Sequence, residues 1–210
     1  MTRMNAQARR VEVLGETVRQ IREKGMATVR IADVAAGMNV SPALIMYHFE
    51  TKEKLMVEAL TYAAERDLLK LARIMRGSFS PARLLMAALQ WYAPTGQARG
   101  WKIWVDAWSA SMRDASLAHV LADLQGQWTR AISGIIDDGV AAGTFTTESS
   151  YAAATRLTSL LDGLAVRMLV HKEAIDRAHT QAWLLRQVAW ELGVQEDWLA
   201  SEMSVEVAGE

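Results

Sequence analysis

The sequence of 210 residues contains no cysteine and only three prolines. The absence of cysteine excludes disulfide bonds, thiolate catalysis and cysteine-ligated metal sites. No apolar run approaches the roughly 20 residues that a helix needs to cross a bilayer, and the N-terminal segment lacks the apolar region of a signal peptide. We therefore expect no membrane partner and a cytoplasmic location.

The sequence also lacks the motifs of common catalytic sites. It has no glycine-rich phosphate loop, no nucleophile elbow and no HExxH zinc pair. Asp137 and Asp138 are adjacent, so on a helix their side chains point about 100° apart, unlike a catalytic pair on one face. His119, His171 and His179 are isolated along the chain. We predict that the protein is not an enzyme and has no cofactor or metal.

Charge is nearly balanced over the whole chain, with a formal net charge of −1. Its distribution is uneven, because residues 1–55 carry nine Lys or Arg and six Asp or Glu, whereas the remainder carries fourteen and eighteen. A basic end on an acidic body is a weak indication that the first quarter of the chain meets an anion. Ordinary fluctuation over a short segment explains it equally well.

Strand-length alternation of apolar and polar residues is nearly absent, whereas apolar residues recur at helical spacing. Those between Val11 and Ile21 form one such stripe, and Gly25 is typical of the residue after a helix. The fold class predicted is all-α, with eight or nine helices and a short turn and frayed end after Gly193. Further helices are predicted at 30–37, 41–49, 51–76, 82–91, 101–113, 117–140, 148–171 and 176–192.

The segment VSPALIMYHFETKEKL, residues 40–55, combines a helix-start signal with several large side chains. Ser41 is a favoured N-cap residue, and Pro42 stands at the first helical position. Asn39, in the turn before it, is the non-glycine residue best suited to a left-handed conformation. Two short helices joined in this way have the proportions of a helix-turn-helix, whose second helix fits the major groove of DNA. Packing of Tyr47 and His48 within a helical hairpin is the alternative.

The stretch TVRIADVAAGMNVSPALIMYHFETKEKL, residues 28–55, resembles the DNA-binding segment of the tetracycline-repressor (TetR) family. Two positions depart from the pattern. Asn39 stands where glycine is usual, and Arg30 stands where Thr or Ser usually caps the helix, so a cap is lost and a cation able to reach phosphate is gained. The residues that carry the resemblance are Val34-Ala35, Val40-Ser41, Tyr47-His48-Phe49, Lys52 and Leu55.

This resemblance implies a DNA-binding transcriptional regulator, a repressor that a small-molecule inducer releases from an inverted-repeat operator in double-stranded DNA. Tyr47 and Lys52 match phosphate-binding positions, and most of the others match groove-facing ones. The groove face has no Arg, Asn or Gln for bidentate readout of bases, so thymine methyl contacts and DNA shape are expected to matter more. The predicted DNA-binding residues are Arg30, Ser41, Pro42, Ala43, Leu44, Met46, Tyr47, His48 and Lys52.

Trp101, Trp104 and Trp108 fall on one face of the helix predicted at 101–113, a large apolar surface that is either core packing or the lining of a pocket. Asp106 lies on the opposite side of that helix. Residues 101–121 and 160–169 resemble the ligand-binding domain of the subfamily typified by the choline-responsive repressor of betaine synthesis. That resemblance allows a cationic amine held by cation–π attraction, and a neutral apolar inducer fits the sequence as well. The predicted lining residues are Trp91, Tyr92, Trp101, Trp104, Trp108, Met112 and Trp128.

The helices predicted at 148–171 and 176–192 carry apolar residues over a wide arc, more than one core-facing side requires. In the TetR family the last two helices pair with those of a second copy, which implies a homodimer; a helix buried on all sides is the alternative. The predicted interface residues are Leu157, Leu161, Leu164, Met168, Leu185, Val188 and Leu192.

The expected organisation is a helix-turn-helix DNA-binding domain at 1–50, a larger helical ligand-binding and dimerisation domain at 51–195, and a C-terminal tail at 196–210. Two other functions stay open. The N-terminal helices of an interaction module would bind protein, and their binding would not weaken steeply with salt as DNA binding does. A constitutive repressor would bind DNA but respond to no inducer.

Overall fold

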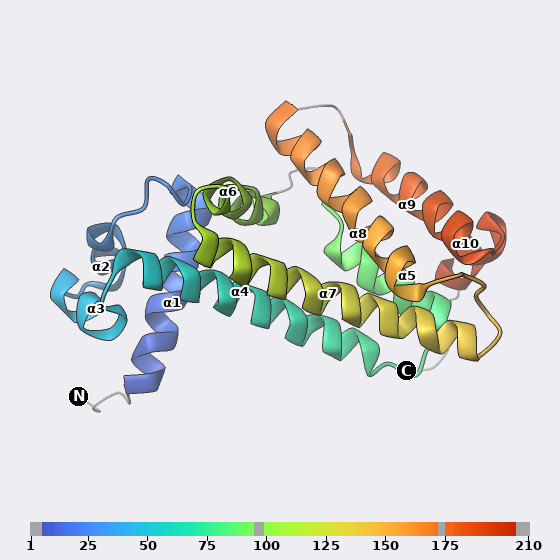
Figure 1. The fold of residues 1–210 in the computed structure, drawn as a ribbon, viewed down its shortest axis with the longest axis horizontal. Coiled ribbons are helices and arrows are strands. Elements are labelled where there is room, and N and C mark those ends of the chain that lie inside the picture. The colour runs from blue at the N-terminus through green and yellow to red at the C-terminus, as the bar shows by residue number, and fades with distance from the viewer. Residues whose placement is uncertain (1–5, 95–98, 172–174, 205–210) are drawn as a thin grey trace. The chain divides into compact units, whose positions relative to one another are not determined.

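The computed structural model describes residues 6–94, 99–171 and 175–204. Within these ranges the fold is all-α, as predicted, with no strand, and no helix there is long and apolar enough to span a bilayer. In chain order (Figure 1) the elements are α1 (Ala6–Lys24), α2 (Ile31–Met38), α3 (Pro42–Phe49), α4 (Lys52–Met75), α5 (Pro81–Tyr92), the 3-10 turn η1 (Arg99–Trp101), α6 (Lys102–Ser111), α7 (Ala115–Ala141), α8 (Ser150–Val166), the π-helical turn η2 (Arg167–His171), α9 (Arg177–Leu192) and α10 (Glu196–Ser204).

Local capping signals explain many of the helix boundaries. Side chains that precede six helices accept a hydrogen bond from a backbone N–H in the first turn, which satisfies a donor without a partner inside the helix. Gly193 adopts a φ of 64° directly after α9, the left-handed conformation that ends a helix. The six capping residues are Ser41, Thr51, Ser80, Asp114, Ser149 and Asp176.

The segment after Gly193 is not the frayed end that we expected, because most of it forms α10. Leu199 of α10 is fully buried, and the Ser80 hydroxyl, at the start of α5, donates a hydrogen bond to Glu202 at 2.5 Å. A helix this short is marginal without tertiary contacts, and α10 receives them from the neighbouring α9 and from α5, more than a hundred positions away in the sequence. Residues 205–210 lie outside the described part of the chain.

The chain divides into two compact units. The first comprises residues 1–68 and 99–124, and the second comprises residues 69–98 and 125–210. This division differs from the predicted ranges, since α6 and the first part of α7 belong with the N-terminal helices. Helices α4 and α7 each contribute residues to both units.

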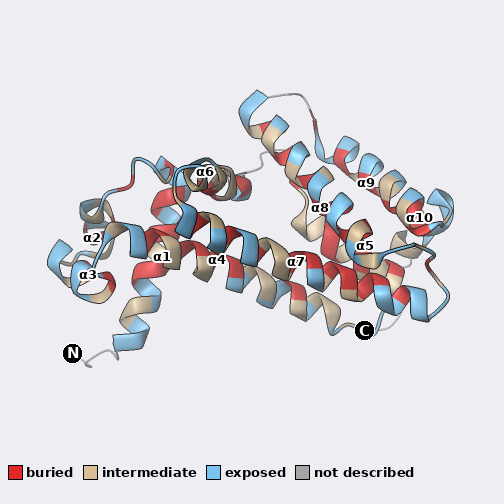
Figure 2. Cartoon of the chain, viewed as in Figure 1, coloured by how far each residue is buried: buried red, intermediate tan, exposed pale blue. Residues whose placement is uncertain are grey.

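In the first unit the apolar face of α1 packs in one core with α2, α3 and the first part of α4. Helix α6 joins this core through Ile103 and Ala107. Its Asp106 carboxylate accepts a hydrogen bond at 3.0 Å from the backbone N–H of Met26, in the turn after α1. Asp106 therefore has a structural partner on the side of α6 away from the tryptophans. Figure 2 shows buried residues along α1 and α7.

In the second unit, residues predicted to form the dimer interface are buried within a single chain. A side chain with almost no exposed surface cannot contact a second copy, so these residues belong to the core of the protomer. The buried leucines of α8 and α9 pack inside their own unit, so an interface on these helices has to use side chains that are exposed in the single chain. Nearly or fully buried are Leu157, Leu161, Leu164, Met168, Val188 and Leu192, while Leu185 is partly exposed.

Candidate DNA-binding helix and aromatic cluster

The turn between α2 and α3 has the predicted geometry. Asn39 lies in the left-handed region, with φ 55° and ψ 46°, and the next backbone N–H, of Val40, donates to the Ala35 oxygen at 3.0 Å. At the other end of α2, the Asp33 carboxylate accepts a hydrogen bond from the backbone N–H of Arg30 at 2.8 Å. The hydrogen bond to Asp33 therefore partly compensates for the capping side chain that Arg30 does not provide.

Helix α3 has one buried side and one exposed side. Ile45 and Phe49 point into the core of the first unit, whereas Tyr47 is 82% exposed. Leu44 and His48 are half-buried at the margin between the two sides. The remaining residues predicted to face DNA are all exposed, namely Ser41, Pro42, Ala43 and Met46.

The junction between α3 and α4 is a tight turn. Glu50 has φ 63° and ψ −52°, and the backbone N–H of Thr51 donates to the Phe49 oxygen at 2.7 Å, which together define a γ-turn with strained geometry. The Lys54 ammonium forms an ion pair with Glu50 and holds the pKa of that carboxyl below its usual value. Lys52 is the first residue of α4, where the free N–H groups and the helix dipole favour an anion such as phosphate.

Arg10 is a functional candidate that the sequence pattern did not single out. It lies on α1 and donates a hydrogen bond to the backbone oxygen of His48, near the end of α3. It is also ion-paired with Glu58 of α4. Its neighbours in the sequence carry no signal of these contacts, because the two partners are 38 and 48 positions away.

The tryptophans of η1 and α6 pack within the first unit. Trp104 and Trp108 lie against its hydrophobic core, and Trp101 is almost fully buried, with its ring 6.1 Å from that of Trp108. Met112, by contrast, is 75% exposed at the end of α6. This packing favours the core alternative for the three tryptophans, and Met112 does not join them.

The other three residues predicted to line a pocket come together in the second unit. The ring of Trp128, on α7, stacks on that of Trp91 at 5.4 Å and is 4.9 Å from that of Tyr92, both on α5. The Tyr92 hydroxyl donates a hydrogen bond to the carboxylate of Asp162, on α8, at 2.6 Å. The Lys70 ammonium lies 5.5 Å from the centroid of the Trp91 ring. We call these five residues the aromatic cluster.

Asp162 is the acidic residue of the aromatic cluster, and its pKa is shifted by burial. Burial penalises its charged form and raises the pKa of this carboxyl to about 6, although the hydrogen bond from Tyr92 acts in the opposite direction. Burial also raises the pKa of Tyr92 well above its usual value. Among the described residues, no Lys, Arg or His forms an ion pair with Asp162. Sequence spacing gave no indication of this carboxyl, which lies within the leucine-rich run of α8.

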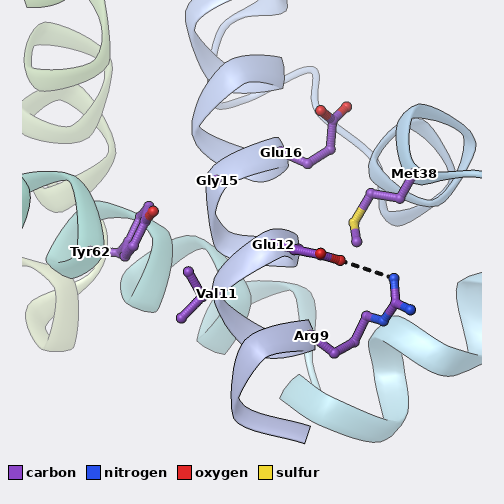
Figure 3. A pocket seen from close by; sticks show the side chains of 7 residues that line it. All are labelled: Arg9, Val11, Glu12, Gly15, Glu16, Met38 and Tyr62. Atoms are coloured by element: carbon purple, nitrogen blue, oxygen red, sulfur yellow. Dashed lines mark hydrogen bonds and ion pairs between the residues drawn. The ribbon is translucent and has the colours of Figure 1, made fainter. Parts of the chain in front are cut away.

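One surface groove of about 480 Å³ lies on the first unit, beside α1. Its carboxylates already have cationic partners, since Glu12 pairs with Arg9 and Glu16 with Arg19. None of the residues predicted to bind DNA or an inducer lines it. The lining residues, drawn in Figure 3, are Arg9, Val11, Glu12, Gly15, Glu16, Met38 and Tyr62.

A capped helix-turn-helix with an exposed second helix, followed by a larger helical body, is the architecture of a DNA-binding regulator. Residues 13–59 match the family model described as bacterial regulatory proteins, tetR family, and residues 81–193 match the model of the C-terminal part of BetI-type transcriptional repressors. The chain belongs to the TetR family and has a BetI-type C-terminal region, in agreement with both resemblances in the sequence. It is a DNA-binding transcriptional regulator and not an enzyme.

Individual relatives agree with this assignment. The HTH-type transcriptional regulators BetI of Burkholderia mallei and Burkholderia pseudomallei are each 29% identical to the chain over 177 residues, which cover 80% of this chain and 85% of theirs. A putative transcriptional regulator from Saccharomonospora viridis, solved in complex with choline, is 25% identical with a TM-score of 0.79 and matches 89% of this chain and 98% of its own. A TetR transcription regulator from Haloarcula marismortui has a TM-score of 0.80 at 18% identity, covers 89% of this chain and 99% of its own, and shows the fold alone.

Proposed function

We propose that the protein is a cytoplasmic, homodimeric repressor that binds an inverted-repeat operator and is released from it by a small cationic amine. The observation that carries the DNA-binding part is the exposed side of α3. Ser41, Ala43 and Met46 form a surface of short or flexible side chains that fits a major groove, while Tyr47 and Lys52 flank it as phosphate ligands. A two-fold dimer presents two such helices about 34 Å apart, so its operator is an inverted repeat.

The proposed dimer uses exposed aromatic residues of α8 and α9 in place of the buried leucines. Trp190 is 82% exposed and Trp183 is 42% exposed, and they lie two helical turns apart on the same side of α9. Tyr151, also exposed, lies on α8, which packs beside α9. Exposed tryptophan is uncommon on a monomer and frequent at the centre of protein interfaces. A second copy of this two-helix surface is the occupant that we propose.

The aromatic cluster supports a cationic inducer. Asp162 is a mostly buried carboxyl whose charged form has no cationic partner among the described residues, so an added cation would relieve its burial penalty. The ring of Trp91 already has the ammonium of Lys70 near its face, a position in which aromatic rings attract cations. The Saccharomonospora viridis regulator, solved with choline, makes a quaternary ammonium the first ligand to test.

A route from ligand to DNA follows from α4. Lys70 belongs to this helix, which begins at Lys52, directly after the recognition helix. An amine that takes the position of the Lys70 ammonium over Trp91 displaces a side chain of α4. Only a ligand that binds the displaced state more tightly can shift the equilibrium, and a coupling of about 1–3 kcal/mol lowers operator affinity about 5- to 150-fold.

The DNA-binding part is tested by selecting the wild-type protein on randomised DNA duplexes and measuring affinity for the selected sequence at several salt concentrations. We expect a two-fold symmetric site and an affinity that falls steeply as salt rises. The absence of any selected sequence, together with binding that is independent of salt, would refute the proposal in favour of a protein-interaction module.

The inducer part is tested with choline and with its uncharged carbon analogue. We expect choline, but not the analogue, to change tryptophan fluorescence and to lower affinity for the selected operator, and we expect Asp162→Asn to abolish both effects. Equal responses to the two compounds would exclude a role for the charge. An operator affinity that no amine changes would indicate a constitutive repressor.

A further inference from the structure

The guanidinium of Arg10 joins three helices of the first unit. From α1 it donates a hydrogen bond to the backbone oxygen of His48 and forms an ion pair with Glu58 of α4. Its central carbon also lies 4.3 Å from the centroid of the Phe49 ring. Its planar group of several N–H donors can make these contacts at the same time, which a single ammonium cannot do. Two of the three contacts are to the last two residues of α3.

The hydrogen bond from Arg10 to the His48 oxygen provides a donor for one of the carbonyl groups at the end of α3. The last carbonyls of a helix have no partner inside it. The Met46 oxygen accepts a hydrogen bond from the Glu50 backbone N–H at 2.8 Å, and the Phe49 oxygen accepts one from Thr51 at 2.7 Å. The His48 oxygen between them accepts from Arg10. It therefore depends on a side chain of another helix, and a cation there also complements the negative end of the helix dipole.

Few other interactions fix the orientation of α3. The helix has eight residues and only two buried side chains, Ile45 and Phe49, and a helix of that length does not persist on its own. The rings of Tyr47, His48 and Phe49 are in successive edge contact, with centroids 5.4 Å and 6.4 Å apart. The ring that Arg10 covers is thus connected to the exposed tyrosine that we place against DNA.

We propose that Arg10 is a positioning residue for DNA recognition. By holding the end of α3 to α1 and α4, it sets the angle at which the exposed side of α3 enters the major groove. Contacts with base edges in the groove require accurate placement of the helix, whereas contacts with the charged phosphates tolerate small displacements. A change in this angle should therefore weaken base readout more than it weakens phosphate binding. Arg10 therefore determines the preference for the operator over other DNA without contacting DNA itself. This inference rests on the proposed function, since it requires that the protein has a defined operator.

Arg9 provides a matched control. It precedes Arg10 on α1, and the two side chains are similarly exposed, at 33% and 31%. It forms an ion pair with Glu12, three residues further along the same helix. Removal of either arginine deletes one positive charge at nearly the same place, so the general attraction to phosphate falls by a similar amount. Only the removal of Arg10 releases α3.

The experiment measures affinity for the operator selected by the wild-type protein and for a shuffled duplex of the same composition. The variants are Arg9→Ala, Arg10→Ala, Arg10→Lys and Glu58→Gln, each first shown by circular dichroism to be folded at the assay temperature. Relative to Arg9→Ala, we expect Arg10→Ala to bind the operator roughly 10- to 100-fold more weakly, the loss that corresponds to one hydrogen bond to a charged group. Both alanine variants should bind the shuffled duplex alike.

The remaining variants separate charge from position. Arg10→Lys keeps the charge, so it should bind the shuffled duplex as the wild type does while its preference for the operator stays reduced. Glu58→Gln should show a smaller loss of preference. Equal losses for Arg9→Ala and Arg10→Ala on both duplexes would overturn the positioning role, and so would an operator preference fully restored in Arg10→Lys. A wild type that selects no sequence would instead refute the proposed function, and the recognition role of Arg10 with it.

Discussion

Asp162→Asn is expected to stabilise the ligand-free protein at neutral pH. A buried carboxyl with a raised pKa binds its proton more tightly in the folded chain than in the unfolded one. As pH rises from about 4 to about 6, the folded chain must either keep a proton that the unfolded chain has released or ionise in a poorly solvated place. The contribution of Asp162 to stability is therefore highest below pH 4 and is lost as pH rises to 6. Asparagine removes this pH dependence and can still accept the hydrogen bond from Tyr92.

The magnitude follows from the two pKa values. The ordinary pKa of 3.8 and the folded-state pKa of about 6 differ by about two pH units, and each unit corresponds to about 1.36 kcal/mol. The penalty above pH 6 is thus at most about 3 kcal/mol. In a chain of this length, 1 kcal/mol shifts Tm by about 2–4 °C, so Asp162→Asn should raise Tm at pH 8 by up to about 10 °C. At pH 4 the folded chain holds the proton and the unfolded chain still holds it in part, so the two proteins should melt at nearly similar temperatures.

The assay is thermal unfolding of wild type and Asp162→Asn in steps from pH 4 to pH 8. Asp138→Asn, at an exposed position of α7, makes the same chemical change where substitutions alter stability little. The difference in Tm between Asp162→Asn and wild type should grow with pH and level off above pH 6, whereas that for Asp138→Asn should stay small. If Asp162→Asn destabilises the protein equally at every pH, the carboxyl is a required acceptor and not a source of strain.

The remaining predictions concern the surface of α3, the dimer and α10. Tyr47→Phe and Lys52→Ala should each weaken binding to all DNA sequences alike, and Lys52→Ala should also lower the slope of affinity against salt; unchanged affinity in both variants would contradict the assignment of α3 to DNA. Trp190→Glu should give a folded monomer by light scattering, whereas Leu161→Glu should unfold the chain, since it places an unpaired charge in the protomer core; a Trp190→Glu protein that remains dimeric would move the interface elsewhere. Leu199→Asp should lower Tm without changing operator affinity, and an unchanged Tm would show that α10 adds no stability.

Local signals predicted the helix-turn-helix well because its geometry depends on neighbouring residues. The conformation of Asn39 and the cap at Ser41 each depend on residues within a few positions. The division of α3 into a buried side and an exposed side follows equally from helical spacing. The γ-turn at Glu50 did not follow, because nothing in that residue type favours a positive φ, and the turn is held by the two helices that it connects.

The dimer interface shows the limit of periodicity. A wide apolar arc on α8 and α9 indicates that much of each helix is buried, but it does not distinguish burial in the same chain from burial against a second copy. Most of the predicted leucines are buried in the same chain, and exposed tryptophans such as Trp190 are the side chains that we propose for the second. Helical spacing likewise did not show that the tryptophans predicted to line one pocket lie in two different compact units. Those of α6 belong to one compact unit and those of α5 and α7 to the other, an assignment that comes from the tertiary fold.

Asp162 and the stability prediction bear directly on the identity of the ligand. A mostly buried carboxyl that lowers the stability of the ligand-free protein has no structural benefit that asparagine would not also provide. Residues of that kind are concentrated at functional sites, where stability is lost for the sake of binding. The same substitution should therefore have opposite effects on two measurements: Asp162→Asn should raise Tm at pH 8 and abolish the response to choline. A variant that is both more stable and still released from DNA by choline would place the cation elsewhere in the protein.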